Sequence, residues 1–175
     1  MLAEGPLLAD GGMGTSLIER GAPADTCLEE LNHRDPELIT AIHRAFLGAG
    51  ARLVLTNTFG ANRYRLERHG SSSRVTDLCA EAVHLAHESG AQLVGGSVGP
   101  LGVRLSPYGR VRPDEAFAAY LEQIAALAEA GVDLVVIETQ TDLAELEQAV
   151  LAAREAAPEL GLIASATLKS RSNSS

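Results

Sequence analysis

The chain has 175 residues, of which 46% are hydrophobic and 21% charged, a composition that predicts one globular domain and excludes disordered and fibrous proteins. Its 14 basic and 23 acidic residues give a formal net charge of −9, which argues against a nucleic-acid surface and against an anionic membrane. No apolar run approaches the ~20 residues of a membrane span, and no secretory signal is recognisable. With only two cysteines there is no disulfide framework, so we expect a cytoplasmic protein.

In chain order, a short apolar segment at 6–10 is followed four times by the same unit: a helical pattern, a glycine and a second apolar run. These four apolar runs lie at 52–59, 92–99, 133–140 and 162–168. Each run is short and does not strictly alternate, which is typical of a strand buried on both faces. The sequence therefore predicts five strands separated by helices.

The predicted helices carry apolar residues one turn apart, along the stretches 38–46, 75–85, 117–128 and 143–153. Asp35 before Pro36 is typical of a helix start, and Asp142 with Glu145 resembles a capping box. Glycines suited to the left-handed position follow the predicted helices, at Gly50, Gly90, Gly131 and Gly161.

This alternation of strands and helices predicts an α/β fold with a parallel sheet and right-handed crossovers. Two architectures remain open, an open doubly wound sheet and a (β/α)₈ barrel. In both, functional residues gather at the carboxyl ends of the strands. If the barrel is correct, residues 1–168 supply about its first five β/α units, roughly three units are missing, and residues 169–175 form a polar tail.

Three segments at predicted strand ends could carry chemistry. DGGMGT at 10–15 places three glycines where backbone N–H groups can approach a carboxylate or phosphate, although a tight turn would need glycine equally. Glu138 ends the apolar run LVVIE, where a carboxylate is costly unless a cation or a hydrogen-bond donor partners it. TNTFGAN at 56–62 offers hydroxyls, amides and Phe59 for a polar pocket, or simply forms a turn.

The cysteines and histidines give weaker indications. Cys79 lies on an apolar helical stripe and is expected in the core, whereas Cys27 could be a ligand or nucleophile but has no paired Cys or His nearby in the sequence. His84 and His87 are three residues apart on one predicted helix, where a solvated face is the simpler interpretation because no third metal ligand is evident.

Taken together, the segments resemble the homocysteine S-methyltransferase domain family. The matching pieces are LLADGGMGT (7–15), CLEELNHRDPELITAIHRAFLGAGARLVLTNTFGAN (27–62), VGGSVGPLG (94–102) and GVDLVVIETQTDLAELEQAVLAARE (131–155). The segment CLEELN is similar to the homocysteine domains of cobalamin-dependent methionine synthase and of fusions with methylenetetrahydrofolate reductase.

The resemblance implies a (β/α)₈ barrel that transfers a methyl group from an activated donor to the zinc-bound thiolate of homocysteine, forming methionine. Zinc is the implied cofactor, and cobalamin or methyltetrahydrofolate could supply the methyl group through other domains. The implied small-molecule partners are homocysteine and the methyl donor. A second copy of the chain or a missing C-terminal domain is a possible protein partner, and neither nucleic acid nor a membrane is expected to bind.

The residues implied to bind homocysteine are Asp10, Gly11, Gly12, Gly14, Thr15, Thr58, Phe59 and Glu138. Loop N–H groups would hold the substrate carboxylate, Glu138 with Asp10 its ammonium, and Thr58 with Phe59 would line the pocket. The family's three zinc cysteines, which include a Cys-Cys pair, have no counterpart here, so no catalytic or metal residue is predicted in this chain. Two other functions stay open: a non-catalytic half-barrel that binds an amino acid or assembles with a partner, and an unrelated α/β enzyme with an anion-binding glycine loop.

Overall fold

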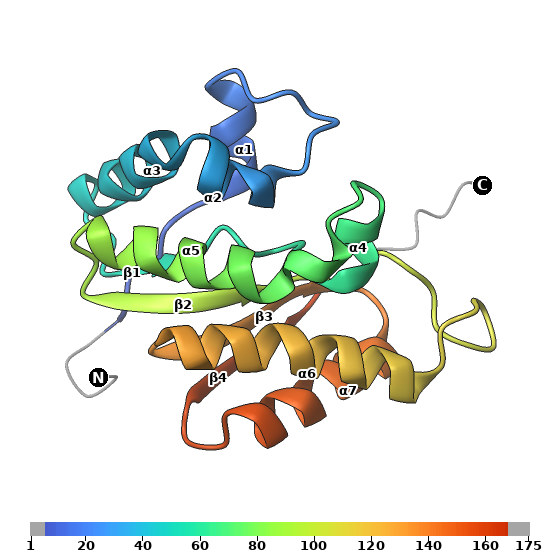
Figure 1. The fold of residues 1–175 in the computed structure, drawn as a ribbon. Helices are drawn as coiled ribbons and strands as arrows, with labels where there is room; N and C mark the ends of the chain where they lie inside the picture. Colours follow the sequence, from blue (N-terminus) through green and yellow to red (C-terminus); the bar gives the residue numbers. More distant parts are fainter. Residues whose placement is uncertain (1–5, 168–175) are drawn as a thin grey trace, which may run out of the picture.

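The computed structural model describes residues 6–167, which form an α/β fold with helices packed against a four-stranded parallel sheet (Figure 1). The strands are β1 (Leu53–Leu55), β2 (Leu93–Val98), β3 (Leu134–Gln140) and β4 (Gly161–Ala166). The helices are α1 (Met13–Glu19), α2 (Leu31–Arg34), α3 (Pro36–Gly48), α4 (Arg63–Glu67), α5 (Val75–Glu88), α6 (Pro113–Ala130) and α7 (Leu143–Ala156), with 3₁₀ turns η2 (Leu28–Glu30) and η3 (Ser72–Arg74). The predicted polar tail and the last residue of the fifth predicted strand lie outside the described residues.

The strands follow one another across the sheet in chain order, β1-β2-β3-β4, and every pair is parallel. Four of the five predicted strands are thereby confirmed. The prediction of a strand at 6–10 was wrong, because this segment forms only a single parallel bridge, Ala9 to Leu53. Its backbone hydrogen bonds surround that bridge: Asp10 N donates to the Leu53 carbonyl at 3.0 Å, and the amides of 52 and 53 donate to the Leu8 carbonyl at 2.9 and 3.3 Å. The segment still runs beside β1 and brings Asp10 to the sheet.

The two faces of the sheet differ, and this difference decides between the two predicted architectures. On one face Val54, Val94 and Ile137 belong to the main core, which they share with apolar residues of α5, α6 and α7. The other face carries a small separate cluster of Leu53, Leu134 and Val136, with no helix residue in it. Helices pack in the order α3, α5, α6, α7 around the covered face (Figure 1). A sequential parallel sheet with helices on one face is part of a (β/α)₈ barrel and not a doubly wound sheet.

The predicted helix ends are mostly confirmed. Asp35 caps α3 by accepting a hydrogen bond from Leu38 N at 3.2 Å, with Pro36 at the first helical position. Asp142 caps α7, but the predicted capping box was wrong, because Glu145 is buried and its carboxylate binds groups on other elements. Glycines follow α3, α5 and α6 with left-handed φ values of 104°, 89° and 96°, whereas Gly161 instead begins β4.

Strand β4 is not buried on both faces as the sequence predicted. Five of its six residues are exposed, and Ile163 keeps 48% of its surface accessible. Within the described residues β4 pairs only with β3, so its second edge presents unpaired backbone groups. Ile163 lies opposite Val136 in the register and therefore on the face that no helix covers.

We expect this exposed strand to make the 175-residue chain self-associate, because an unpaired edge and an apolar face both favour pairing with another chain. Light scattering over a concentration series should show dimers or larger species, and Ile163→Lys should shift the distribution toward monomer by placing a charge on the contact. A monomer at high concentration, with strong hydrogen-exchange protection of β4, would contradict this expectation.

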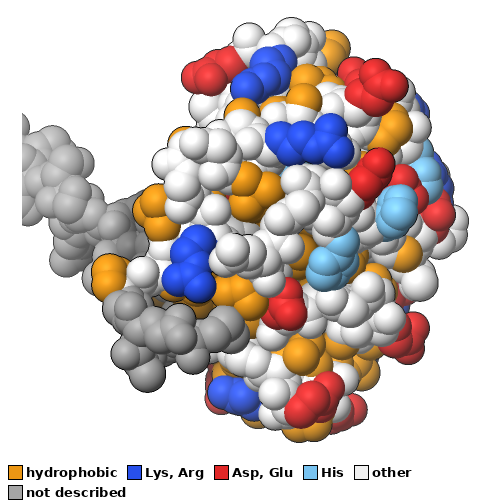
Figure 2. Space-filling model, turned by 90° about the vertical axis from the view of Figure 1, so that its left-hand side faces the viewer, with side chains coloured by type: hydrophobic (Ala, Val, Ile, Leu, Met, Phe, Trp, Pro, Cys, Tyr) orange, Lys and Arg blue, Asp and Glu red, His pale blue; other side chains and the backbone are white. Residues whose placement is uncertain are grey.

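Charged side chains are spread over the surface. Figure 2 looks onto the amino-terminal ends of the strands and shows arginines interspersed with Asp and Glu among apolar and histidine side chains. This mixture matches the acidic composition and lacks the dense basic stripe of a nucleic-acid surface on the face shown. Among the described helices, none is long and apolar enough to cross a membrane.

Candidate functional site

A cavity of about 420 Å³ opens at the carboxyl ends of β1, β2 and β3, beside the glycine loop that leads into α1. It is lined by Asp10, Gly11, Gly12, Met13, Gly14, Leu28, Glu29, Leu55, Thr56, Asn57, Phe59, Ser97 and Glu138. Six of the eight residues predicted from the sequence therefore lie together. Thr15 and Thr58 are not among the lining residues.

The two remaining predicted residues, Thr58 and Thr15, lie next to residues that line the cavity. The Thr58 hydroxyl is fully buried, donates to the Ser97 carbonyl at 2.8 Å and lies 2.6 Å from the Thr56 hydroxyl. Thr15 lies in α1, with its hydroxyl 3.3 Å from the position that a Cβ on Gly12 would occupy. Both side chains thus pack against residues that line the cavity.

Gly11 of the glycine loop lies too close to a neighbouring side chain to carry a side chain of its own. A Cβ on Gly11 would lie 2.9 Å from the Phe46 ring, so a side chain there would force this ring to shift. No side chain caps the first turn of α1, whose N-cap is Gly12. The first amides of a helix have no partner within it, so the loop leaves backbone donors near the cavity.

Two carboxylates reach the cavity from different elements. Glu138, near the end of β3, accepts a hydrogen bond from the Ser97 hydroxyl at 2.7 Å. Asp10 uses Oδ2 to accept from Leu55 N at 2.9 Å, while its buried Oδ1 has no hydrogen-bond partner in the described part of the chain. Burial, with a smaller contribution from the Glu138 charge, raises the pKa of Asp10 to about 6. An unpartnered buried carboxylate oxygen next to a second carboxylate favours a cationic ligand.

The backbone is irregular where Glu138 meets the cavity. The β3–β4 register shifts between Ile137 and Gln140, and Thr139 has a φ of 59°. A β-branched residue rarely adopts the left-handed region, and such strain concentrates at functional sites. This irregularity was not predicted, because the sequence of 133–140 has the pattern of an uninterrupted strand.

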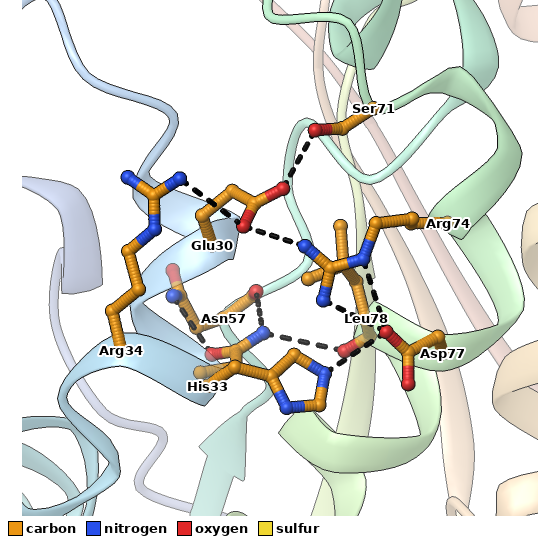
Figure 3. Close-up of polar contacts among 9 residues, drawn as sticks. Glu30, His33, Arg34, Asn57, Ser71, Arg74, Asp77 and Leu78 are labelled. Atoms are coloured by element: carbon orange, nitrogen blue, oxygen red, sulfur yellow. Dashed lines mark hydrogen bonds and ion pairs between the residues drawn. The ribbon is translucent and has the colours of Figure 1, made fainter.

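Cavity residues Leu28 and Glu29 come from a segment to which the sequence pattern assigned no role. Glu29 accepts from Gly60 N at 2.7 Å through Oε1, and Oε2 lies 3.4 Å from the Cys27 thiol, which donates to it. The neighbouring residue Glu30 is 4% exposed, and its carboxylate accepts from the Ser71 hydroxyl and from Arg74, both at 2.6 Å (Figure 3). These bonds lower the pKa of Glu30 and tie the segment to the start of α5.

An amide pair fixes the same segment to the end of β1. The Asn57 side chain donates to Asn32 Oδ1 at 2.9 Å and to the Leu28 carbonyl at 2.8 Å. In return Asn32 donates to the Asn57 carbonyl at 3.1 Å and to the Leu78 carbonyl at 3.3 Å (Figure 3). Three of the four bonds are buried and the bond to the Leu28 carbonyl is partly buried, so together they hold the cavity wall in one position. Asn57 was recognisable from the polar strand end, whereas Asn32 was quoted only within the matching segment CLEELN and had no predicted role.

The described residues do not fit a zinc site. Across residues 6–167 no three His, Cys, Asp or Glu side chains gather closely enough to hold a metal ion. Cys79 lies in the core as predicted, and burial raises the pKa of its thiol to about 12. Burial and the Glu29 charge raise the pKa of Cys27 to about 11, so neither thiol is poised as the thiolate that zinc binds.

Comparison with known proteins adds independent findings. A family model described as homocysteine S-methyltransferase matches residues 7–175. The chain is 33% identical to methionine synthase of Mycobacterium leprae over 174 residues, covering 91% of this chain and 14% of that protein. It is 32% identical to homocysteine S-methyltransferase of Escherichia coli over 161 residues, covering 81% of this chain and 52% of that protein.

Solved structures agree with this match. The homocysteine methyltransferase MmuM from Escherichia coli superimposes with a TM-score of 0.82 in its oxidized form and 0.81 in its metallated form, at 28% and 27% identity. Each superposition covers 96% of this chain and 65% of that one. The chain thus spans between about one seventh and two thirds of the length of the proteins that it matches.

Proposed function

Because the chain belongs to the homocysteine S-methyltransferase family, we propose that its cavity binds the amino-acid end of homocysteine for a methyl transfer that forms methionine. The observation that supports this proposal is the unpartnered buried Oδ1 of Asp10 beside the glycine loop, in a cavity that Glu138 also lines. An α-amino acid carries an ammonium and a carboxylate on the same carbon atom. It therefore matches acidic side chains on one side of the cavity and backbone donors on the other.

In this arrangement Asp10 and Glu138 hold the substrate ammonium, and N–H groups of Gly11, Gly12 and Gly14 receive its carboxylate. Ser97 orients Glu138 through its 2.7 Å hydrogen bond, and Leu55 N orients Asp10. Phe59 and Leu28 then leave an apolar wall for the substrate's methylene groups. The chain's own residues bind and orient the amino acid, and no step is assigned through zinc because the described residues do not fit it.

The alternative of an anion-binding glycine loop is less consistent with the same cavity. Its charged lining residues within 6–167 are Asp10, Glu29 and Glu138, and among these described residues no Lys or Arg lines it. A phosphate group there would meet three acidic side chains without a compensating cation. The net acidity favours a ligand that brings its own positive charge.

Calorimetry with three ligands tests the proposal. L-homocysteine should bind saturably, 4-mercaptobutyrate should bind much more weakly because it lacks only the ammonium, and inorganic phosphate should not compete with homocysteine. Equal affinity for homocysteine and 4-mercaptobutyrate would contradict the assigned role of the two carboxylates.

The raised pKa of Asp10 predicts a pH dependence of binding. The ammonium needs an ionised Asp10, and a carboxyl with a pKa of about 6 is mostly protonated at pH 5. Homocysteine affinity should therefore rise by about tenfold between pH 5 and pH 7, with release of one proton. In Asp10→Asn the affinity should be lower and nearly constant over this range, because the amide keeps the Leu55 hydrogen bond without the titration. A wild-type affinity that stays constant from pH 5 to pH 7 would exclude Asp10 from ammonium binding.

A further inference from the structure

A second cavity, of about 310 Å³, lies on the opposite side of the wall formed by Leu28, Glu29 and Phe59. Three basic side chains line it: Arg65 in α4, and Arg68 and His69 directly after that helix. This gathering contrasts with a chain that has 23 acidic and 14 basic residues. It also contrasts with the first cavity, whose charged lining residues are all acidic.

The two guanidinium groups have no carboxylate partner in the described part of the chain, where other arginines, such as Arg63 and Arg74, form ion pairs. Arg65 Nε donates to the Pro100 carbonyl at 2.8 Å, and Arg68 donates to the Gly102 carbonyl. Backbone carbonyls accept hydrogen bonds but do not neutralise a charge. The cavity therefore keeps two uncompensated positive charges.

The single carboxylate that lines this cavity is Glu29, and both of its oxygens are already engaged. One accepts from Gly60 N at 2.7 Å and the other from the Cys27 thiol at 3.4 Å. Glu29 lies outside ion-pair distance of both arginines, so it offsets their charge only in part. The remaining charge suits an anionic ligand.

Arg65 is also held in place before any ligand arrives. Its guanidinium lies 5.3 Å from the centre of the Phe59 ring, a distance at which cation and ring attract, and its Nε is fixed by the Pro100 carbonyl. These contacts leave the two terminal nitrogens of Arg65 available to donate. A guanidinium fork with free terminal nitrogens matches the oxygens of a phosphate group.

We propose that this cavity is a second ligand site, which binds a phosphate group through Arg65 and Arg68 with His69 at its edge. A dianion matches the two uncompensated guanidinium charges, whereas a monocarboxylate would neutralise only one of them. This site is separate from the homocysteine cavity, because the two cavities have only the wall of Leu28, Glu29 and Phe59 in common.

Inorganic phosphate is the probe that tests this proposal, with binding followed by calorimetry and by NMR at the amides of 65–69. We expect saturable binding with a Kd of about 1 mM or lower. Arg68→Gln should weaken it by about tenfold or more, because Arg68 is exposed and its loss removes one charge-assisted contact without disturbing the core. Arg154→Gln, at an exposed arginine of α7 that does not line the cavity, should bind phosphate like the wild type.

Three results would overturn the proposal: no saturation at roughly 10 mM phosphate, an equal loss of affinity in Arg68→Gln and Arg154→Gln, or acetate binding as tightly as phosphate. Homocysteine affinity, measured on the same variants, should be unchanged in Arg68→Gln. The two affinities together distinguish failure of the phosphate proposal from failure of the homocysteine proposal.

Discussion

Replacing Glu138 by glutamine is expected to weaken homocysteine binding by about 10- to 150-fold while leaving the stability of the fold nearly unchanged. The substitution removes a charge-assisted contact to the substrate ammonium, which contributes about 1.5–3 kcal/mol. The amide oxygen can still accept the hydrogen bond from Ser97, so the end of β3 keeps its partner. Calorimetry gives the affinity, and thermal unfolding gives the stability.

The matched control is Glu147→Gln, which removes the same charge from an exposed position of α7 far from the lining residues. Its affinity for homocysteine should equal that of the wild type. If Glu138→Gln also binds like the wild type, Glu138 does not contact the ammonium.

Replacing Glu145 by alanine is expected to cost about 2–6 kcal/mol of unfolding free energy. One oxygen of this buried carboxylate accepts from Leu101 N at 2.6 Å and from the Tyr120 hydroxyl at 2.8 Å, joining α7 to the loop after β2 and to α6. Its removal leaves two buried donors without an acceptor, at about 1–3 kcal/mol each. Denaturant unfolding measures the loss.

Two further variants show whether the cost arises from these contacts. Tyr120→Phe removes one donor together with its need for an acceptor, and leaves one buried donor unpaired, the Gln140 amide that donates to the Tyr120 hydroxyl at 3.2 Å. Because Glu145→Ala leaves two buried donors unpaired, Tyr120→Phe should cost less. Glu147→Ala changes an exposed acid on the same helix and should alter stability by less than about 0.5 kcal/mol. A loss in Glu145→Ala no larger than that in Glu147→Ala would show that the carboxylate is not structural.

Local patterns predicted much of the fold because they report burial on a regular element. The stripe at 117–128 and the run at 133–140 became α6 and β3, since apolar periodicity directly reflects which face packs on the core. The prediction of a strand at 6–10 was wrong, because a short apolar run does not show how many residues will pair with the neighbouring strand. Strand β4 was predicted as buried, yet its exposure depends on what packs beside it and not on its own residues.

In the candidate site, too, some residues were predicted from the sequence and others were not. Asp10, the glycines and Glu138 were found from the sequence, because polar residues directly after apolar strands meet at one edge of a parallel sheet. Glu29 and Asn32 were not, because they come from a segment without periodicity that is positioned by long-range hydrogen bonds to Gly60 and Asn57. Glu145 was misassigned because its spacing from Asp142 suits a local cap, whereas its carboxylate bonds to residues 25 and 44 positions away.

The most direct test of the account is an NMR titration of the ¹⁵N-labelled chain with L-homocysteine, read residue by residue. We expect saturable shifts of the amides of Gly11, Gly12, Gly14 and Glu138, with little change in the described residues of β4 or at residues 65–69. No saturable shift at these four amides, or shifts confined to another part of the molecule, would contradict the claim that this cavity recognises homocysteine.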